Sequence, residues 1–264
     1  MKQILLTLIV VIIVGVTVHA QSTATATPDP GITVYMYRKV PDDKREEFIK
    51  RETTYWAEML RKEIPKGNIT FWALLEKVGG YDMENSSNFL FINTYRNIDA
   101  MNEIWANITT AFPNVTMDKM ETNSISTTTS VLFLRDAGWQ EATGVVADEE
   151  YRFINMIYHN SSDPNAFVDL ENKHWAPFIK TVMDKKQTSM RGWGNAVVLS
   201  PHSNKMNFNS VSYDLYPTLK EALIPTWDSQ VVVPESLNEG MSEINKLETA
   251  PRSQVIYRIV KVVN

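Results

Sequence analysis

An internal repeat constrains the fold of this chain more than any other feature of its sequence. Residues 47–56 resemble residues 166–175, and Phe, Glu and Trp recur between the two segments at a constant offset of 119. Trp72 and Trp193 follow at nearly the same offset. A period of this length is far too long for a solenoid. The sequence therefore predicts a duplicated domain.

Hydrophobic periodicity predicts the order β-α-β-β-α-β in each half. In the first half we expect strands at 32–37, 69–78, 89–95 and 127–134, and helices at 41–64 and 98–112. In the second half we expect strands at 151–158, 192–199, 208–215 and 253–263, and helices at 164–185, 219–224 and 236–247. This order is that of a ferredoxin-like unit, in which both helices cover one face of an antiparallel sheet.

The predicted strands are apolar on both faces. In residues 69–75 both alternating sets of side chains are apolar or aromatic, and residues 89–92 are apolar on both sides. A sheet with helices on one face and water on the other alternates more regularly between apolar and polar residues. We therefore expect the second face of each sheet to be buried, with the sheet of the other half as the nearest partner.

Two ferredoxin-like units packed sheet to sheet resemble the dimeric α/β-barrel superfamily, here as a tandem duplication in one chain. The resemblance covers residues 31–263 and rests on the element order, the duplication and the two-sided strands. It implies an α+β fold, a pseudo-dimeric α/β barrel, and small-molecule binding between helices and sheet. Members include cofactor-free monooxygenases, lactone isomerases, haem-degrading enzymes, haem peroxidases and stress-induced proteins of unknown role, and no residue pattern here selects one branch.

These features divide the chain into five segments. We expect a signal peptide at 1–20, a flexible N-terminal segment at 21–30, a first ferredoxin-like unit at 31–135, a linker at 136–150 and a second unit at 151–264. Because both sheets belong to one chain, the molecule is expected to be a monomer.

The first twenty residues are typical of a secretory signal. Lys2 precedes a largely apolar run at 4–18, and small residues follow at the positions that a signal peptidase reads. The run is shorter than the roughly 20 residues that a membrane span needs, so we expect cleavage and no membrane association afterwards. The chain contains no Cys, and an exported domain of this size without disulfides favours a bacterial envelope. The predicted location is periplasmic or secreted.

The charge balance excludes several partners. The 264 residues include 31 acidic and 26 basic ones, and loss of Lys2 with the signal leaves a net charge near −6. An acidic chain is not expected to bind nucleic acid or an anionic membrane surface. Because there is no Cys, thiolate-metal frameworks are excluded, and no other motif predicts a metal or a cofactor.

One glutamate in each half stands where a helix pattern calls for a hydrophobic residue. Glu52 lies between Phe48 and Trp56 at a spacing of four, and Glu171 has equivalent neighbours in the second half. If this helix face packs on the sheet, burial raises the pKa of each carboxyl unless a cation or several donors hold it charged. Such a group can act as a general base or a ligand hook. The alternative is that it only fixes the helix on the sheet, with Arg191 as a candidate partner of Glu171.

His174 lies three residues after Glu171, and Tyr55 occupies the equivalent place in the first half. Helical spacing puts Glu171 and His174 on neighbouring surface, where they could share a substrate proton. Two ligands do not make a metal site, and the spacing of His159 and His202 does not demand a third. Glu171 and His174 are therefore the candidate catalytic pair, and the alternative for His174 is a polar residue at the edge of the helix.

Recurring tryptophans supply candidate walls for a binding pocket, although large apolar residues at such positions usually fill the core. Gly192 and Gly194 flank Trp193 within a predicted strand and suggest a bulge or a close backbone approach. The candidate ligand-binding residues are Glu52, Tyr55, Trp56, Trp72, Trp175, Arg191 and Trp193.

The sequence leaves three functions open. The first is an exported protein that binds a small apolar or aromatic molecule between helices and sheet. The second is a cofactor-free monooxygenase or isomerase that uses Glu171 and His174. The third is a structural duplication whose pockets are packed shut. A cavity of several hundred Å³ beside Glu52 and Glu171 would favour the first two.

Overall fold

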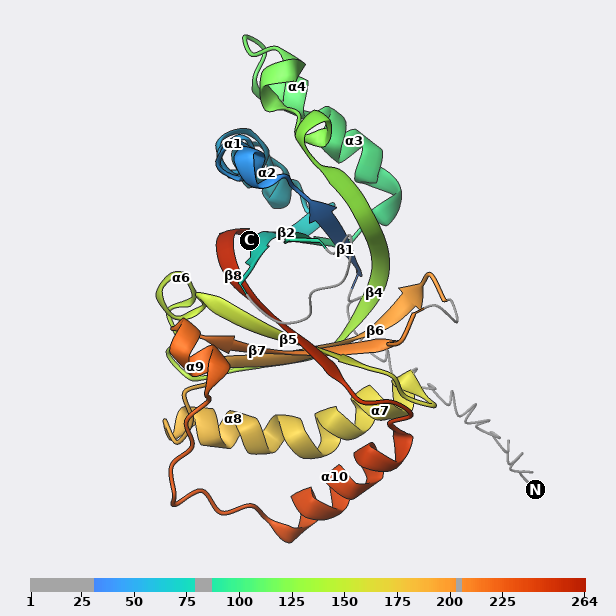
Figure 1. The fold of residues 1–264 in the computed structure, drawn as a ribbon, viewed down its shortest axis with the longest axis vertical. Coiled ribbons are helices and arrows are strands. Elements are labelled where there is room, and N and C mark those ends of the chain that lie inside the picture. Colours follow the sequence, from blue (N-terminus) through green and yellow to red (C-terminus); the bar gives the residue numbers. More distant parts are fainter. Residues whose placement is uncertain (1–30, 79–86, 203–205) are drawn as a thin grey trace, which may run out of the picture.

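The computed structural model of the chain describes residues 31–78, 87–202 and 206–264. The fold is mixed α+β, and eight antiparallel strands form a closed barrel in the order β1-β3-β2-β8-β5-β7-β6-β4 (Figure 1). The signal peptide expected at 1–20 and the segment expected at 21–30 lie outside the described residues and stay predictions.

The strands lie where the periodicity predicts them, apart from their ends. Antiparallel pairing of β2 with β8 and of β4 with β6 joins the two halves edge to edge. The strand bounds are β1 Ile32–Lys39, β2 Ile69–Lys77, β3 Phe89–Tyr95, β4 Thr127–Glu141, β5 Phe153–His159, β6 Gly192–Ser200, β7 Ser210–Tyr216 and β8 Ser253–Val263.

Helices cover the barrel from outside: α1 to α4 lie beyond the sheet of the first half, and α7, α8 and α10 lie beyond the sheet of the second (Figure 1). The extra helix expected at 236–247 is confirmed as α10. The helix bounds are α1 Arg45–Arg51, α2 Ala57–Glu63, α3 Met101–Ala106, α4 Ile108–Ala111, α5 Met117–Met120, α6 Ala147–Glu150, α7 Pro164–Leu170, α8 Ala176–Asp184, α9 Leu219–Leu223 and α10 Glu235–Leu247.

The two faces of the sheet belong to different hydrophobic cores. On the outer face Trp72 packs in one cluster with Phe48 of α1, and Trp193 packs in another beside α8. On the inner face, residues of both halves, such as Leu75 and Val211, share a single cluster inside the barrel. The expectation that each sheet buries its second face against the other half is thereby confirmed.

Strand β4 is longer than its sequence pattern predicts. The predicted strand ends at Leu134, but the observed strand continues to Glu141, through residues assigned to the linker. Its first part pairs with β1, and residues 133–141 pair with β6 across a shift in register between Asp136 and Gly138. Asp and Gly are typical of loops, which is why this stretch does not look like a strand. One strand therefore belongs to both halves of the barrel wall.

Each long helix contains a π-helical turn at the repeated motif. These turns are η2 (Glu52–Trp56), between α1 and α2, and η6 (Glu171–Trp175), between α7 and α8. The sequence predicts two long helices there but not the π turns, which are rare and occur often at functional sites. The first residue of each turn is the repeated glutamate, and both glutamates are buried, as the pattern predicts.

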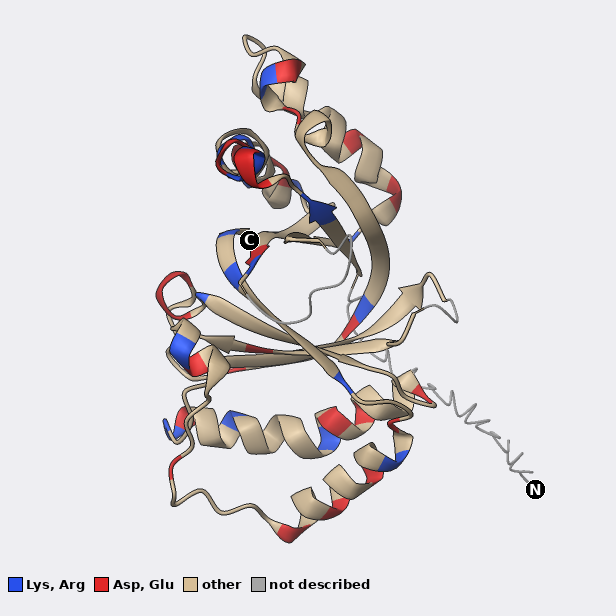
Figure 2. Cartoon of the chain, viewed as in Figure 1, with Lys and Arg blue, Asp and Glu red and all other residues tan. Residues whose placement is uncertain are grey.

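Charged residues lie mainly on the outer helices and at the ends of strands, and α10 carries several acidic ones (Figure 2). None of the helices within the described ranges is both long enough and apolar enough to cross a membrane.

Candidate binding site inside the barrel

A cavity of about 620 Å³ lies inside the barrel. Strands of both halves and the segment around α6 form its wall, and most of the lining side chains are apolar or aromatic. The lining residues are Thr33, Tyr35, Phe71, Ala73, Leu75, Ile92, Thr94, Asp136, Ala137, Gly138, Trp139, Glu141, Ala147, Asp148, Tyr151, Ile154, Tyr213, Leu215, Ile259, Val262 and Asn264.

Asp136 of β4 places a carboxyl group in the cavity wall. The Thr33 hydroxyl on β1 donates a hydrogen bond to Asp136 Oδ2 at 2.6 Å. The hydroxyls of Thr33 and Thr94 lie 2.9 Å apart, so Thr94 on β3 donates in turn to Thr33. These three side chains form a polar patch that could orient a ligand held by apolar contacts.

The low polarity of the cavity shifts the pKa values of its ionisable groups. Burial raises the pKa of Asp136, and the hydrogen bond from Thr33 opposes that shift. Burial also raises the pKa of Tyr35 and Tyr213, and the charge of Asp136 adds to both shifts. Both phenols therefore stay protonated at neutral pH and can donate hydrogen bonds.

Three aromatic rings line the cavity close to one another. The Trp139 ring lies 6.0 Å from that of Tyr151, nearly perpendicular to it, and 6.1 Å from that of Tyr213. Trp139 is 45% exposed, which places it where the cavity opens to solvent. The Tyr151 hydroxyl donates to Glu141 Oε2 at 3.0 Å, so a carboxylate adjoins this aromatic group.

Two glycines of β6 make room for these rings. In the strand pairing Gly194 lies between Trp139 of β4 and Tyr213 of β7. A Cβ atom on Gly194 would lie 2.5 Å from the Tyr213 ring, and one on Gly192 would lie 3.1 Å from Trp139. Strand β6 lies between β4 and β7. Because glycine has no side chain, the rings of Trp139 on β4 and Tyr213 on β7 can meet over β6. The group that approaches Gly194 is the Tyr213 side chain, not the backbone that the sequence suggests.

The repeated glutamates lie outside the barrel, between helix and sheet. Glu52 Oε1 accepts a 2.6 Å hydrogen bond from the Thr122 hydroxyl. Burial raises the pKa of Glu52 to about 7, against the opposing effects of Thr122 and of the Arg38 guanidinium. In this half the carboxyl group has a hydroxyl donor and a cation nearby.

Glu171 lies among polar residues of the second sheet. Its carboxylate accepts 2.9 Å hydrogen bonds from the Ser212 hydroxyl and from Asn195 Nδ2. Burial raises the pKa of Glu171 to about 7, and these donors oppose the shift. Burial also raises the pKa of the neighbouring Asp214 to about 7, and the charge of Glu171 contributes.

His174 and Arg191 each contact residues other than Glu171. The His174 ring packs on Gly240 of α10, where an added Cβ would lie 2.2 Å from His174 Cγ, and it lines a separate outer cavity of about 450 Å³. The expected pairing of Arg191 with Glu171 is wrong: Arg191 Nε pairs with Glu150 at 2.9 Å. Arg191 precedes β6, and the end of α6 supplies the nearest acid.

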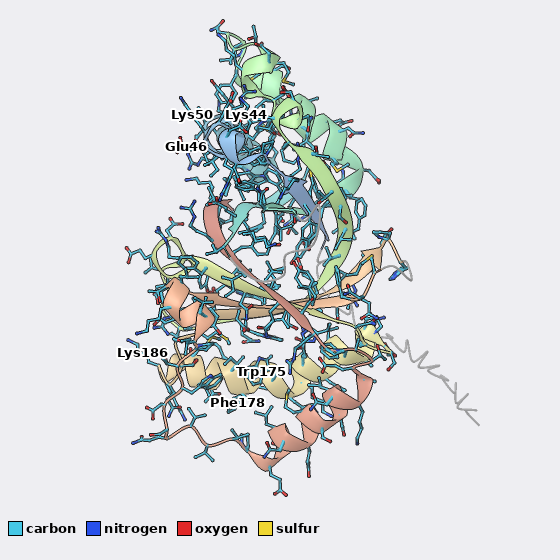
Figure 3. The ribbon with its side chains drawn as sticks, in the orientation of Figure 1. Lys44, Glu46, Lys50, Trp175, Phe178 and Lys186 are labelled. Atoms are coloured by element: carbon cyan, nitrogen blue, oxygen red, sulfur yellow. The ribbon has the colours of Figure 1, made fainter. Side chains whose placement is uncertain are left out.

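The remaining predicted residues pack with other aromatic groups. Trp72 and Trp193 are buried in the outer cores. Trp56 donates its indole N–H to the Met120 carbonyl oxygen at 2.9 Å. Tyr55 packs edge-on against Phe112, and Trp175 packs against Phe178 and Trp227; Figure 3 shows Trp175 and Phe178 together on the outer helix.

None of the nine predicted site residues is among the described residues that line the barrel cavity. The sequence predicts binding between helices and sheet, where Glu52 and Glu171 lie, but the barrel cavity lies on the opposite face of the sheet. The roles proposed for those nine residues stay predictions. Sequence reasoning missed Asp136 and Trp139 because both fall in the predicted linker, where apolar and polar residues do not alternate regularly.

The ionisable residues of the described ranges do not form a metal site, since no three His, Cys, Asp or Glu side chains come together there. The cavity itself is lined by the carboxyl groups of Asp136, Glu141 and Asp148, by tyrosine and threonine hydroxyls and by aromatic rings.

No family model matches the chain, and no curated protein matches it. A structure described as a "putative monooxygenase" from Lactobacillus acidophilus matches with a TM-score of 0.55 at 13% identity, over 88% of this chain and 95% of the other. An anthrone oxidase-like protein matches with a TM-score of 0.49 at 12% identity, over 88% and 92%. A chlorite dismutase mutant from Candidatus Nitrospira defluvii matches with a TM-score of 0.45 at 9% identity, over 87% and 92%.

The first of these likenesses and the closed eight-stranded barrel show that the chain has the dimeric α/β-barrel fold, completed here within one chain. At this identity the likeness concerns the fold alone.

Proposed function

We propose that this protein binds a small, largely apolar molecule inside the barrel, with Asp136 as its polar anchor. The observation that carries the proposal is the cavity of about 620 Å³. Small-molecule sites are concave, mostly apolar and contain few polar groups, and their volumes are typically about 300–1,000 Å³. The cavity has these properties, and its polar patch of Thr33, Thr94 and Asp136 provides orientation.

The proposal is tested by titrating the folded protein with 2-phenylethanol and with 1-naphthalenemethanol in a calorimeter. We expect dissociation constants of about 10 μM to 1 mM, as the size of these probes allows. Ala73→Phe and Ile259→Trp each fill the cavity from a different strand and should weaken binding at least tenfold. Val233→Trp adds an aromatic ring at an exposed position outside the cavity and should leave binding unchanged. Equal binding by all variants would contradict the proposal.

A second candidate function is cofactor-free oxygenation or isomerisation, with Asp136 as the general base. It is favoured by a carboxyl of raised pKa inside an apolar cavity and by the name of the Lactobacillus acidophilus structure. In such an oxygenation the carboxylate removes a proton from a hydroquinone-like substrate, and the substrate supplies all four electrons that O2 accepts. One oxygen atom enters the product, which becomes a hydroxyquinone, and the other leaves as water. The test measures oxygen uptake with 1,4-dihydroxynaphthalene. Loss of uptake in Asp136→Asn, with uptake unchanged in Asp214→Asn, would support this function. The version with Glu171 and His174 stays a prediction.

We also propose that each half is a ferredoxin-like unit and that the two arose by duplication. The strand order β4-β1-β3-β2 in the first half recurs as β8-β5-β7-β6 in the second, which supports this history. Further support comes from the π turns, because each begins at the repeated glutamate.

Closure of the barrel by two pairs of strands from one chain supports the further proposal that the protein is a monomer. Light scattering during gel filtration tests it, and a dimer mass would contradict it.

A further inference from the structure

The charges around the barrel cavity all have one sign. Asp136, Glu141 and Asp148 are its charged lining residues, and none of the described residues that line it is Lys, Arg or His. A bound anion would meet no cation among these lining residues and would be repelled by the partly buried Asp136 and by the exposed Glu141 and Asp148. The charge pattern therefore disfavours fatty acids, phosphates and other anionic ligands.

Aromatic faces accompany these acids. Trp139 and Tyr151 form a nearly perpendicular corner, and the Tyr213 ring lies 6.1 Å from Trp139 at an interplanar angle of 34°. Cations are attracted to the faces of such rings, and assemblies of several rings recognise alkylated ammonium groups. The geometry depends on Gly194, which lies between Trp139 and Tyr213 in the strand pairing and leaves room for the Tyr213 ring.

The acids and the rings form one continuous surface. Asp136 and Trp139 are three residues apart on β4 and line the same cavity. Tyr213 on β7 lines this cavity too. Beyond them, Ala73, Leu75 and other apolar residues continue the wall into the barrel.

We infer that the barrel cavity selects an organic cation, a protonated or alkylated amine with an aromatic or aliphatic body. The ammonium group lies among Asp136, Tyr213 and Trp139, and the body occupies the apolar interior beside Ala73 and Leu75. This inference rests on the proposed function and names the ligand class of that site. Glu141 and Asp148 at the rim raise the local concentration of cations before they enter.

The test compares three probes of similar shape and different charge: 2-phenylethylammonium, 2-phenylethanol and 3-phenylpropanoate. Calorimetric titration at pH 7.5 and low salt should show that the cation binds at least tenfold more tightly than the alcohol, and that the anion does not bind measurably. If the alcohol binds as tightly as the cation, the inference is overturned while the proposed function stands. If none of the three binds, both fail.

Variants separate a specific cation site from general attraction to an acidic protein. Asp136→Asn should weaken binding of the cation at least tenfold and leave the alcohol within twofold. Trp139→Leu should also weaken binding of the cation more than binding of the alcohol, so the test does not depend on the folding of a single variant. The melting temperature of each variant is measured first. Glu149→Gln removes the same charge beside the rim without touching the cavity and should change neither affinity. An equal loss in Glu149→Gln and Asp136→Asn would overturn the inference.

Discussion

Glu52 and Glu171 occupy equivalent positions in the two halves, each as the first residue of a π-helical turn, but different charged residues surround them. Arg38 stabilises the charge of Glu52, and Arg252 stabilises that of Glu171. Glu171 also lies near two acids: the charge of Glu248 raises its pKa, and its own charge raises the pKa of the buried Asp214. Burial is the largest influence on both glutamates. The two positions therefore have the same backbone structure but different charged neighbours.

Replacing Glu171 by Gln should change stability in a direction that depends on pH. The pKa of Glu171 is raised from 4.5 to about 7, so the native state binds more protons than the unfolded chain between these values. The stabilising contribution of protonated Glu171 is present below pH 4.5 and is lost as the pH rises through 7. Gln cannot ionise, so the Glu171→Gln variant does not lose this contribution. As the pH rises from 5 to 8, its free energy of unfolding should increase relative to that of the unsubstituted protein, by up to about 3 kcal/mol.

Urea unfolding of both proteins at pH 5, 6, 7 and 8 measures this difference. Glu239→Gln on α10 is the control, because Glu239 is exposed and its replacement should give the same small difference at every pH. The contrary result is a stability gain in Glu171→Gln that stays constant or shrinks as the pH rises. It would show that burial does not raise the pKa of Glu171.

Replacing Glu76 by Gln should have the opposite pH dependence. Glu76 on β2 pairs with Arg258 on β8 across the closure of the barrel, and also with Arg45 of α1. Burial alone would raise the pKa of Glu76, but the hydrogen bonds and charges of both arginines lower it. Its contribution to stability is therefore present above the unfolded pKa and is lost as the pH falls through the folded pKa.

Glu76→Gln is expected to cost about 1–3 kcal/mol at pH 7, and less at pH 3. Glu58→Gln removes an exposed pair with Arg61 on α2 and should cost at most about 0.5 kcal/mol. Chemical unfolding at the two pH values measures both variants. Similar costs for Glu76 and Glu58 at pH 7 would mean that the pairing across β2 and β8 does not stabilise the closed barrel.

Replacing Gly194 by Ala should disturb the aromatic side of the cavity. The added Cβ would lie 2.5 Å from the Tyr213 ring, which must move or strain the sheet, at a cost of about 1–3 kcal/mol. Tyr213→Leu removes the clashing ring and should recover part of the loss in the double variant. A double-mutant cycle from thermal unfolding measures this coupling, and additive effects would show that the ring and Gly194 do not compete for the same space.

Much of the fold could be predicted from the sequence, because the information lay in the repeat and in the apolar faces of the strands. The two-sided pattern of residues 69–75 requires cover on both faces, and the barrel provides it. The end of β4 could not be predicted, since Asp136 and Gly138 have low strand propensity and pairing with β6 overrides it. Local propensity cannot report a partner strand about 60 residues away in the chain.

The candidate site was harder to predict than the fold. Burial of Glu52 and Glu171 follows from helix periodicity, and both are buried. A cavity forms on the face of a sheet that the side chains of the two halves do not fill completely. On the inner face, small residues such as Ala73 and Gly194 leave room beside large rings. A sequence pattern records that a face is apolar but not that it is incompletely filled.

The affinity for 2-phenylethylammonium should rise with pH. Burial raises the pKa of Asp136, and the groups that face it are Thr33 and Tyr35 on β1 and Tyr213 on β7, with Glu141 and Asp148 in the same cavity. Both tyrosines stay neutral, so ionisation of the carboxylates governs the change, while the probe remains a cation throughout. Binding favours the ionised form of Asp136, so affinity increases as the pH rises from 4 through the raised pKa and then levels off. Calorimetry between pH 4 and pH 8 should show this rise in the native protein and a nearly flat profile in Asp136→Asn; an unchanged slope in the variant would assign the dependence to the rim acids instead.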